Sequence, residues 1–294
     1  MQQLGFDGMP TRLFSCTPSK LGSYADCPRK YRMTYLDRPT PARGLPWAHN
    51  SLGASVHNAL RAWWALPRER RTVGRAVALL RAGWLTDGYR DAEQSDATLS
   101  RATGWVESYV ADLDPDDEPV GLERTVATRT ETLAVSGRID RLDERDGELV
   151  VVDYKTGRSA LSADDARGSQ ALALYAVAAE RTLRKPCRTV ELHHLPTGTV
   201  HAHTHTEESL ARHVRRAEDT AADIVAATEK LAAGATADEA FPPSPGPRCS
   251  WCDFRRHCPE GQAASVGKEP WVSVSPEPRA GAVPGAPPPV PSPR

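Results

Sequence analysis

The stretch that most limits what this chain can fold into is GRIDRLDERDGELVVVDYKTG, residues 137–157. It predicts two β-strands joined by a tight turn at Asp146-Gly147, because Asp-Gly between two apolar runs is a strong hairpin signal. An antiparallel pairing can bring Asp140, near the end of one strand, close to Asp153, near the end of the next. Lys155 follows Asp153 by two residues, so both side chains point to the same face of the sheet. The hairpin therefore predicts two carboxylates and one amine on a shared surface.

This group suits a hard divalent cation with a phosphate beside it. The cation would lower the pKa of its bound water and neutralise phosphate charge, while Lys155 could orient that water or stabilise a charged transition state. The alternative is that Asp140 is an ordinary surface charge and that Asp-x-Lys is accidental. Four apolar residues, 149–152, lead directly into Asp153 and favour the functional interpretation.

The rest of the chain alternates between helical and strand patterns. Thr17 as N-cap and Pro18 at the first helical position predict a helix that Pro28 kinks or divides. Helices are also predicted at 51–66, 68–112, 170–183 and 208–233, and strands at 121–129, 132–144, 148–157 and 188–196. This order predicts an α/β core with helical additions at one end.

The residues IDRLD and VVDYKTG resemble the core of the PD-(D/E)XK nuclease superfamily, in particular its RecB-like exonuclease branch. LGASVHNAL resembles that branch's upstream helix, whose metal-binding histidine corresponds to His57; alone, His57 would be an ordinary helix residue. Glu123 in GLERTV resembles an acidic position on the first core strand. The resemblance implies a restriction-endonuclease-like mixed sheet flanked by helices. It also implies that Mg²⁺ or Mn²⁺ is held by the side chains of His57, Asp140 and Asp153 and the carbonyl of Tyr154.

The family also carries a glutamine and a tyrosine four residues apart on the helix after the lysine strand. The available pair here is Gln170 and Tyr175, five residues apart. At about 100° per residue, that spacing directs them to different helix faces. At most one therefore holds the family role, and Tyr175 fits the pattern better.

Six cysteines occur, and three of them, Cys249, Cys252 and Cys258, lie within ten positions. Clustered cysteines in a reducing cytoplasm indicate metal rather than disulfides. The iron–sulfur nucleases of the same branch, of the AddB repair type and the CRISPR adaptation type, combine one early cysteine with a late Cys-x2-Cys-x5-Cys. Cys27 matches the early position, so the resemblance implies a [4Fe–4S] cluster that staples the two ends of the chain. Zinc is the alternative, because spacing alone does not separate the two.

Basic and aromatic residues surround Cys27. Arg29, Lys30, Tyr31 and Arg32 suit a single DNA strand through phosphate contacts and base stacking. The alternative is a solvated helix whose tyrosines pack inward. Farther along, HAHTHT at 201–206 predicts an exposed edge strand rather than a metal site.

The bulk composition places few further limits. The net charge is -1, so any nucleic-acid binding needs a local patch. No signal peptide or membrane-spanning run is evident, and a cytoplasmic protein is expected. We expect a flexible N-terminus at 1–14 and a nuclease domain at 15–265, with a helical insertion at about 58–112. A disordered Pro-rich tail is expected at 266–294.

The expected function is a metal-dependent DNA exonuclease that hydrolyses phosphodiester bonds in single-stranded or end-containing DNA during repair or recombination. The sequence has no GxxxxGK[ST] P-loop, so unwinding would need a separate helicase or repair protein. One alternative is a catalytically weak DNA-end-binding or partner-recognition subunit stabilised by an iron–sulfur cluster. Another is a redox sensor with a vestigial nuclease core. The intact acids and lysine argue against a pure binder.

Overall fold

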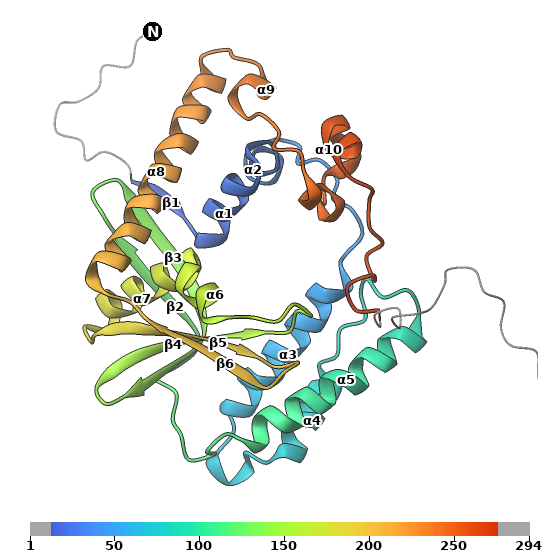
Figure 1. The fold of residues 1–294 in the computed structure, drawn as a ribbon, viewed down its shortest axis with the longest axis vertical. Coiled ribbons are helices and arrows are strands. Elements are labelled where there is room, and N and C mark those ends of the chain that lie inside the picture. The colour runs from blue at the N-terminus through green and yellow to red at the C-terminus, as the bar shows by residue number, and fades with distance from the viewer. Residues whose placement is uncertain (1–12, 276–294) are drawn as a thin grey trace, which may run out of the picture.

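The computed structural model describes residues 13–275 as a mixed six-stranded sheet flanked by helices (Figure 1). The strand order is β1-β3-β4-β5-β6, with β2 paired to β3 as well. Pairings β1–β3 and β4–β5 are parallel, and β2–β3, β3–β4 and β5–β6 are antiparallel. The strands are β1 Phe14–Cys16, β2 Gly121–Arg129, β3 Leu133–Arg145, β4 Glu148–Lys155, β5 Cys187–His194 and β6 Thr199–Thr204. The expected mixed α/β fold is confirmed.

Strands β3 and β4 form the predicted hairpin. Their ladder runs from Arg145 opposite Glu148 to Arg141 opposite Val152. The turn residues Asp146 and Gly147 have φ angles of 52° and 82°. Two successive left-handed residues give the type I′ turn whose twist matches that of the flanking strands, which is why Asp-Gly specifies this register.

Strand β4 is buried on both faces. Val150 and Val152 pack into a helical layer made by α3 (Ala48–Trp64), α4 (Val73–Ala82) and α5 (Ala92–Ala111). Leu149 and Val151 pack on the opposite face against α7 (Gln170–Leu183). A strand covered on both faces needs a continuous apolar run, so residues 149–152 do not alternate with polar ones. The predicted helical segment at 58–112 corresponds to the second half of α3, η1 (Arg68–Arg70), α4 and α5.

The N-terminal helices divide where the sequence predicts. Helix α1 (Pro18–Asp26) begins at Thr17, whose hydroxyl accepts a hydrogen bond from the Lys20 amide, and α2 (Pro28–Tyr35) follows after Cys27. Both helices pack with α8 (Glu207–Ala232) and α9 (Ala237–Ala240) in a third core cluster. The short helices are α6 (Ala163–Gly168), η2 (Pro247–Trp251), η3 (Arg255–His257) and α10 (Pro259–Ala264).

Helix α10, from the C-terminal part of the described chain, lies beside α2, from its N-terminal part (Figure 1). Arg29 is buried and joins them, with its guanidinium 2.5 Å from Glu260 and 3.1 Å from Asp238. The hydrogen bonds from Arg29 hold the pKa of Glu260 at about 2. These contacts close a loop of more than two hundred residues around the sheet.

The expectation of a disordered tail from residue 266 is wrong for residues 266–275. Val274 is buried in the helical core cluster, and Trp271 packs against it. The Pro270 carbonyl accepts a hydrogen bond from the Ala48 amide, at the start of α3. The composition of residues 266–294 as a whole is Pro-rich, and it obscures the two apolar residues that anchor the first part of this segment. Residues 1–12 and 276–294, also expected to be disordered, lie outside the described residues.

Strand β6 is the edge strand predicted from HAHTHT. Within residues 13–275, no helix combines the length and apolar character needed to cross a membrane.

Candidate functional site

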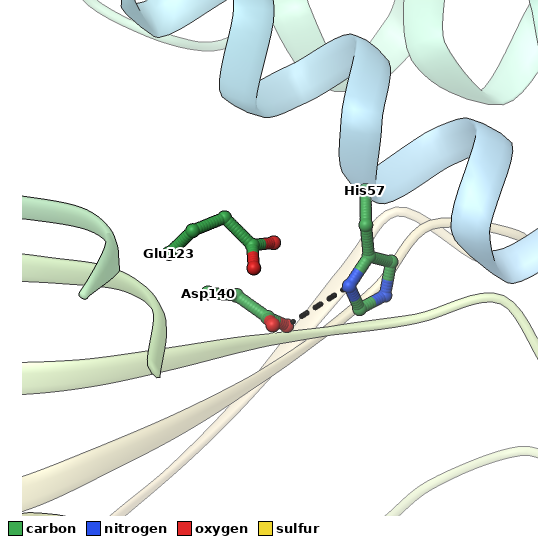
Figure 2. Close-up of side chains that lie close together, drawn as sticks. All are labelled: His57, Glu123 and Asp140. Atoms are coloured by element: carbon green, nitrogen blue, oxygen red, sulfur yellow. Dashed lines mark ion pairs between the residues drawn. The ribbon is translucent and has the colours of Figure 1, made fainter. Parts of the chain in front are cut away.

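Three side chains from separate elements converge beside the hairpin. His57 of α3, Glu123 of β2 and Asp140 of β3 each offer one donor atom, and these atoms lie within 4.8 Å of one another (Figure 2). Imidazole nitrogen and carboxylate oxygen together are donors that suit a divalent metal. The site therefore has the donor chemistry of a metal centre.

The ring of His57 is held at both nitrogens. Its Nε2 lies 3.0 Å from the carbonyl oxygen of Tyr154, and its Nδ1 lies 3.3 Å from Oδ2 of Asp140. Burial disfavours the charged ring, but the Asp140 carboxylate, Asp153 and the Tyr154 carbonyl outweigh it, so the pKa of His57 is raised. A divalent cation bound among these oxygen atoms and a proton on His57 therefore compete for the same negative charge.

Asp153 and Lys155 point the same way, as strand alternation predicts. The Lys155 Nζ lies 2.6 Å from Asp153 Oδ2. Burial raises the pKa of Asp153, and the Asp140 carboxylate adds to that rise against the opposing effect of Lys155. Asp140 in turn accepts a hydrogen bond of 3.1 Å from the Tyr154 amide, which ties it to the end of β4. The hairpin thus brings both acids, the lysine and the Tyr154 carbonyl to one place.

Glu123 is fixed in an unusual way. It has a left-handed φ of 47°, which is uncommon for a residue with a side chain. Its carboxylate lies 2.5 Å from Arg138 Nε. Within residues 13–275, three carboxylates, Glu123, Asp140 and Asp153, therefore form ion pairs with two permanent cations, Arg138 and Lys155. This negative excess favours a divalent cation or a protonated His57.

Gln170 and Tyr175, the glutamine and tyrosine of α7, have different surroundings. Burial raises the pKa of Tyr175, and Asp153 and Asp140 raise it further. Its ring lies against Gly137 on β3, three residues before Asp140. Gln170 lies at the start of α7, and its side-chain amide donates a hydrogen bond of 3.5 Å to the carbonyl oxygen of His213 in α8. The structure therefore brings Tyr175 to the acidic group and directs Gln170 to a neighbouring helix.

Gly137 makes room for Tyr175. A Cβ built at Gly137 would lie 2.2 Å from Cε1 of Tyr175, far inside van der Waals contact. Gly137→Ala should therefore displace the Tyr175 ring and lower stability by about 1–3 kcal/mol, the typical cost of overpacking. Denaturant unfolding of the single variant measures this loss. In a Tyr175→Ala background the same substitution should cost less than about 0.5 kcal/mol, and equal losses in both backgrounds would disprove the contact.

The four cysteines that resemble the iron–sulfur pattern line one cavity of about 240 Å³. Cys27 contributes from the α1–α2 junction, and Cys249, Cys252 and Cys258 contribute from the segment of η2, η3 and α10. Within residues 13–275, no three of these sulfurs lie within 4.8 Å of one another. Cys16 and Cys187 are buried elsewhere, and burial raises their pKa values, to about 11 and about 12.

Hydrogen-bond donors point at the cavity sulfurs. Arg29 Nη1 lies 3.3 Å and the Gly261 amide 3.4 Å from Cys258 Sγ, and the Ser244 amide lies 3.4 Å from Cys27 Sγ. A Cβ at Gly261 would lie 3.4 Å from both Cys249 Sγ and Cys258 Sγ, so this glycine borders two sulfurs. N–H donors around thiolates and a glycine that leaves room beside them fit a metal or cluster in the cavity.

Three of the four residues predicted to touch DNA are buried, which corrects that prediction. Arg29 and Arg32 are 5% and 9% exposed and are used in ion pairs, Arg29 with Glu260 and Arg32 with Asp37. Tyr31 is 1% exposed and packs against other aromatic rings. The inward-packing alternative holds for this tyrosine. Lys30 is half-buried beside the cysteine cavity.

Sequence reasoning missed Arg138 and Gly137. Arg138 follows Gly137 in SGRID, where an isolated glycine inside a strand pattern signals a close approach by another group. That signal could have indicated Gly137. The pairing of Arg138 with Glu123 depends on strand register, which residue types alone do not give.

The sequence was compared with known proteins. A family model described as the PD-(D/E)XK nuclease superfamily matches residues 15–259. A search of curated proteins found no match. The match covers most of the chain and spans the hairpin, α3 and all four cavity cysteines. The chain therefore belongs to the PD-(D/E)XK nuclease superfamily, a family of metal-dependent nucleases.

Proposed function

We propose that this protein is a DNA exonuclease of the RecB-like branch, acting on single-stranded or end-containing DNA in repair or recombination. The observation that carries the proposal is the meeting of His57, Asp140, Asp153 and Lys155 at the end of the β3–β4 hairpin. Acids alone could be a surface cluster. A partly buried acid that contacts a lysine and lies near a histidine and a second acid is the group that phosphodiester hydrolysis needs.

The side chains of His57, Asp140 and Asp153 and the carbonyl of Tyr154 would hold Mg²⁺ or Mn²⁺, with the Asp153 carboxylate turning from Lys155 toward the cation. Glu123, whose donor atom already lies within 4.8 Å of those of His57 and Asp140, would be an outer or second-metal acid. The bound cation supplies charge neutralisation at the phosphate and a more acidic water. Asp140 and His57 are already aligned by the Tyr154 backbone, whose amide and carbonyl bind them on either side. Their positions therefore need little rearrangement.

Lys155 would act on the phosphate. Its ammonium, 2.6 Å from Asp153, is half-exposed and can orient the attacking water or stabilise negative charge on the phosphate oxygens. Hydrolysis forms a bond between the water oxygen and phosphorus and breaks the bond to the leaving sugar oxygen, which takes up a proton. Tyr175, whose ring lies against Gly137 on β3, would position the phosphate from the α7 side.

The cysteine cavity would hold a [4Fe–4S] cluster. A tetrahedral zinc, at about 2.3 Å from each thiolate, needs sulfurs about 3.8 Å apart. Within the described chain, any three of the cavity sulfurs include at least one pair more than 4.8 Å apart. This spacing supports a larger group bridged between them. The cluster would link α2 to the C-terminal segment, as the Arg29–Glu260 pair already does.

Digestion of end-labelled linear and circular single-stranded DNA tests the activity. With Mg²⁺ or Mn²⁺, the linear strand should be degraded and the circle should resist, with EDTA stopping the reaction. Circles cut as fast as linear strands would overturn the exonuclease assignment. Degradation of RNA but not DNA would contradict the assignment of DNA as the substrate.

A further inference from the structure

A cleft of about 550 Å³ is lined by the segment that follows Lys155 in the chain. Residues 156–159, which follow Lys155, form one wall. The first turn of α3, the middle of α5, Trp251 of the cysteine segment and residues 273–275 form the others. This volume is within the range of sites that bind a ligand of nucleotide size.

Aromatic rings dominate one side of the cleft. Trp251 lies 5.2 Å from Trp47 and 5.9 Å from His49, measured between ring centroids. The ammonium of Lys268 lies 4.4 Å from the centroid of Trp251. Trp251 and Trp105 both line the cleft and are only half-buried. Partly exposed aromatic rings with a cation beside them are the stacking platforms that unpaired bases use.

Two arginines supply positive charge to the same cleft. Arg158 donates to the carbonyl oxygen of Ser275 at 3.0 Å, and Arg101 donates to that of Val274 at 2.5 Å. Neither forms an ion pair with a carboxylate within residues 13–275. A guanidinium has five donors, so both can still bind a phosphate.

Helix α3 connects the cleft to the metal donors. His49 and His57 are eight residues apart, which is about 12 Å along a helix. Between them, a Cβ at Gly53 would lie 3.5 Å from the Thr156 hydroxyl, so the chain after Lys155 runs along this part of α3. A distance of 12 Å corresponds to about three or four stacked nucleotides.

We propose that this cleft binds the bases and phosphates of single-stranded DNA about three or four nucleotides from the bond being cut. The inference rests on the proposed nuclease function and adds a substrate-binding region to it. Trp251, with Trp105 and His49, stacks the unpaired bases. Arg158 and Arg101 bind the backbone. Paired bases cannot stack on these rings, so the cleft selects single strands.

Binding can be measured apart from cleavage. Fluorescence anisotropy with labelled dT10 in EDTA should show Kd raised about 10-fold by Arg158→Ala and by Trp251→Leu. Arg158→Ala should also reduce the slope of log K against log salt by about 0.7. Trp251→Phe should bind nearly as the parent does. Arg75→Ala, which removes an exposed charge on α4, should leave Kd unchanged.

Cleavage then tests position. The two cleft variants should lose about 10-fold in kcat/KM on dT10 but nothing on dT2, which is too short to reach the cleft. Unchanged Kd and kcat/KM in both variants of an active enzyme would overturn the cleft and leave the nuclease function standing. Absence of metal-dependent cleavage by the parent would overturn the function, while the Kd values would still report on the cleft. Equal losses on duplex DNA would contradict single-strand selection.

Discussion

Replacing Asp153 by asparagine is expected to reduce metal-dependent degradation of labelled single-stranded DNA by about 10²–10³-fold. The substitution keeps the shape of the side chain but removes the charge that faces Lys155 and lies near His57 and Asp140. Without that charge the remaining donors bind a divalent cation more weakly. Mn²⁺ titration by calorimetry should therefore show weaker binding in the same variant. Lys155→Ala should lose a similar amount of activity yet retain Mn²⁺ binding.

A matched control lies on the same strand. Glu148 starts β4 and is exposed, at the end of the hairpin opposite to the acids. Glu148→Gln should leave both cleavage and Mn²⁺ binding unchanged. Since burial disfavours the charged form of Asp153, its neutral variant should unfold at a temperature close to that of the parent. Full activity of both Asp153→Asn and Lys155→Ala would show that neither side chain takes part in the reaction.

Much of the site could be predicted because it is local. The hairpin is specified by one Asp-Gly turn, and strand alternation then sets the shared face of Asp153 and Lys155. Because register follows from the turn, it also determines that Asp140 comes near Asp153. His57 needed the family resemblance, since nothing in a helix pattern says which strand will pack against it.

What the sequence did not reveal depends on distant packing. Arg29 and Tyr31 have the composition of a DNA-binding helix, but contacts with Glu260 and Phe241, more than two hundred residues away, bury them. The cleft is likewise assembled from α3, α5 and Trp251. Pairing between segments so far apart is a property of the complete fold, and local residue patterns carry no signal for it.

Cys252→Ser is expected to abolish iron binding and brown colour and to lower the unfolding temperature by about 10 °C. Cys252 lines the cavity with Cys27, and burial raises its pKa, so it is stable as a thiolate only when a metal group holds it. Losing one ligand releases a closed loop of more than two hundred residues, for which a loss of about 5 kcal/mol is the expected scale. Anaerobic purification with iron, sulfide and zinc assays, followed by thermal unfolding, measures both effects.

Cys16→Ala provides the control for that experiment. Cys16 is buried in a different core cluster, so its loss should cost some stability but leave iron content and colour unchanged. The contrast separates a cofactor ligand from an ordinary buried thiol. One zinc per chain without iron in the parent protein would contradict the cluster. A Cys252→Ser variant as stable as the parent would mean that the Arg29–Glu260 and Arg29–Asp238 pairs hold the two ends together without it. The two results have different physical causes, because the ion pairs require no ligand while a four-cysteine cluster cannot tolerate the loss of one thiolate without weakening.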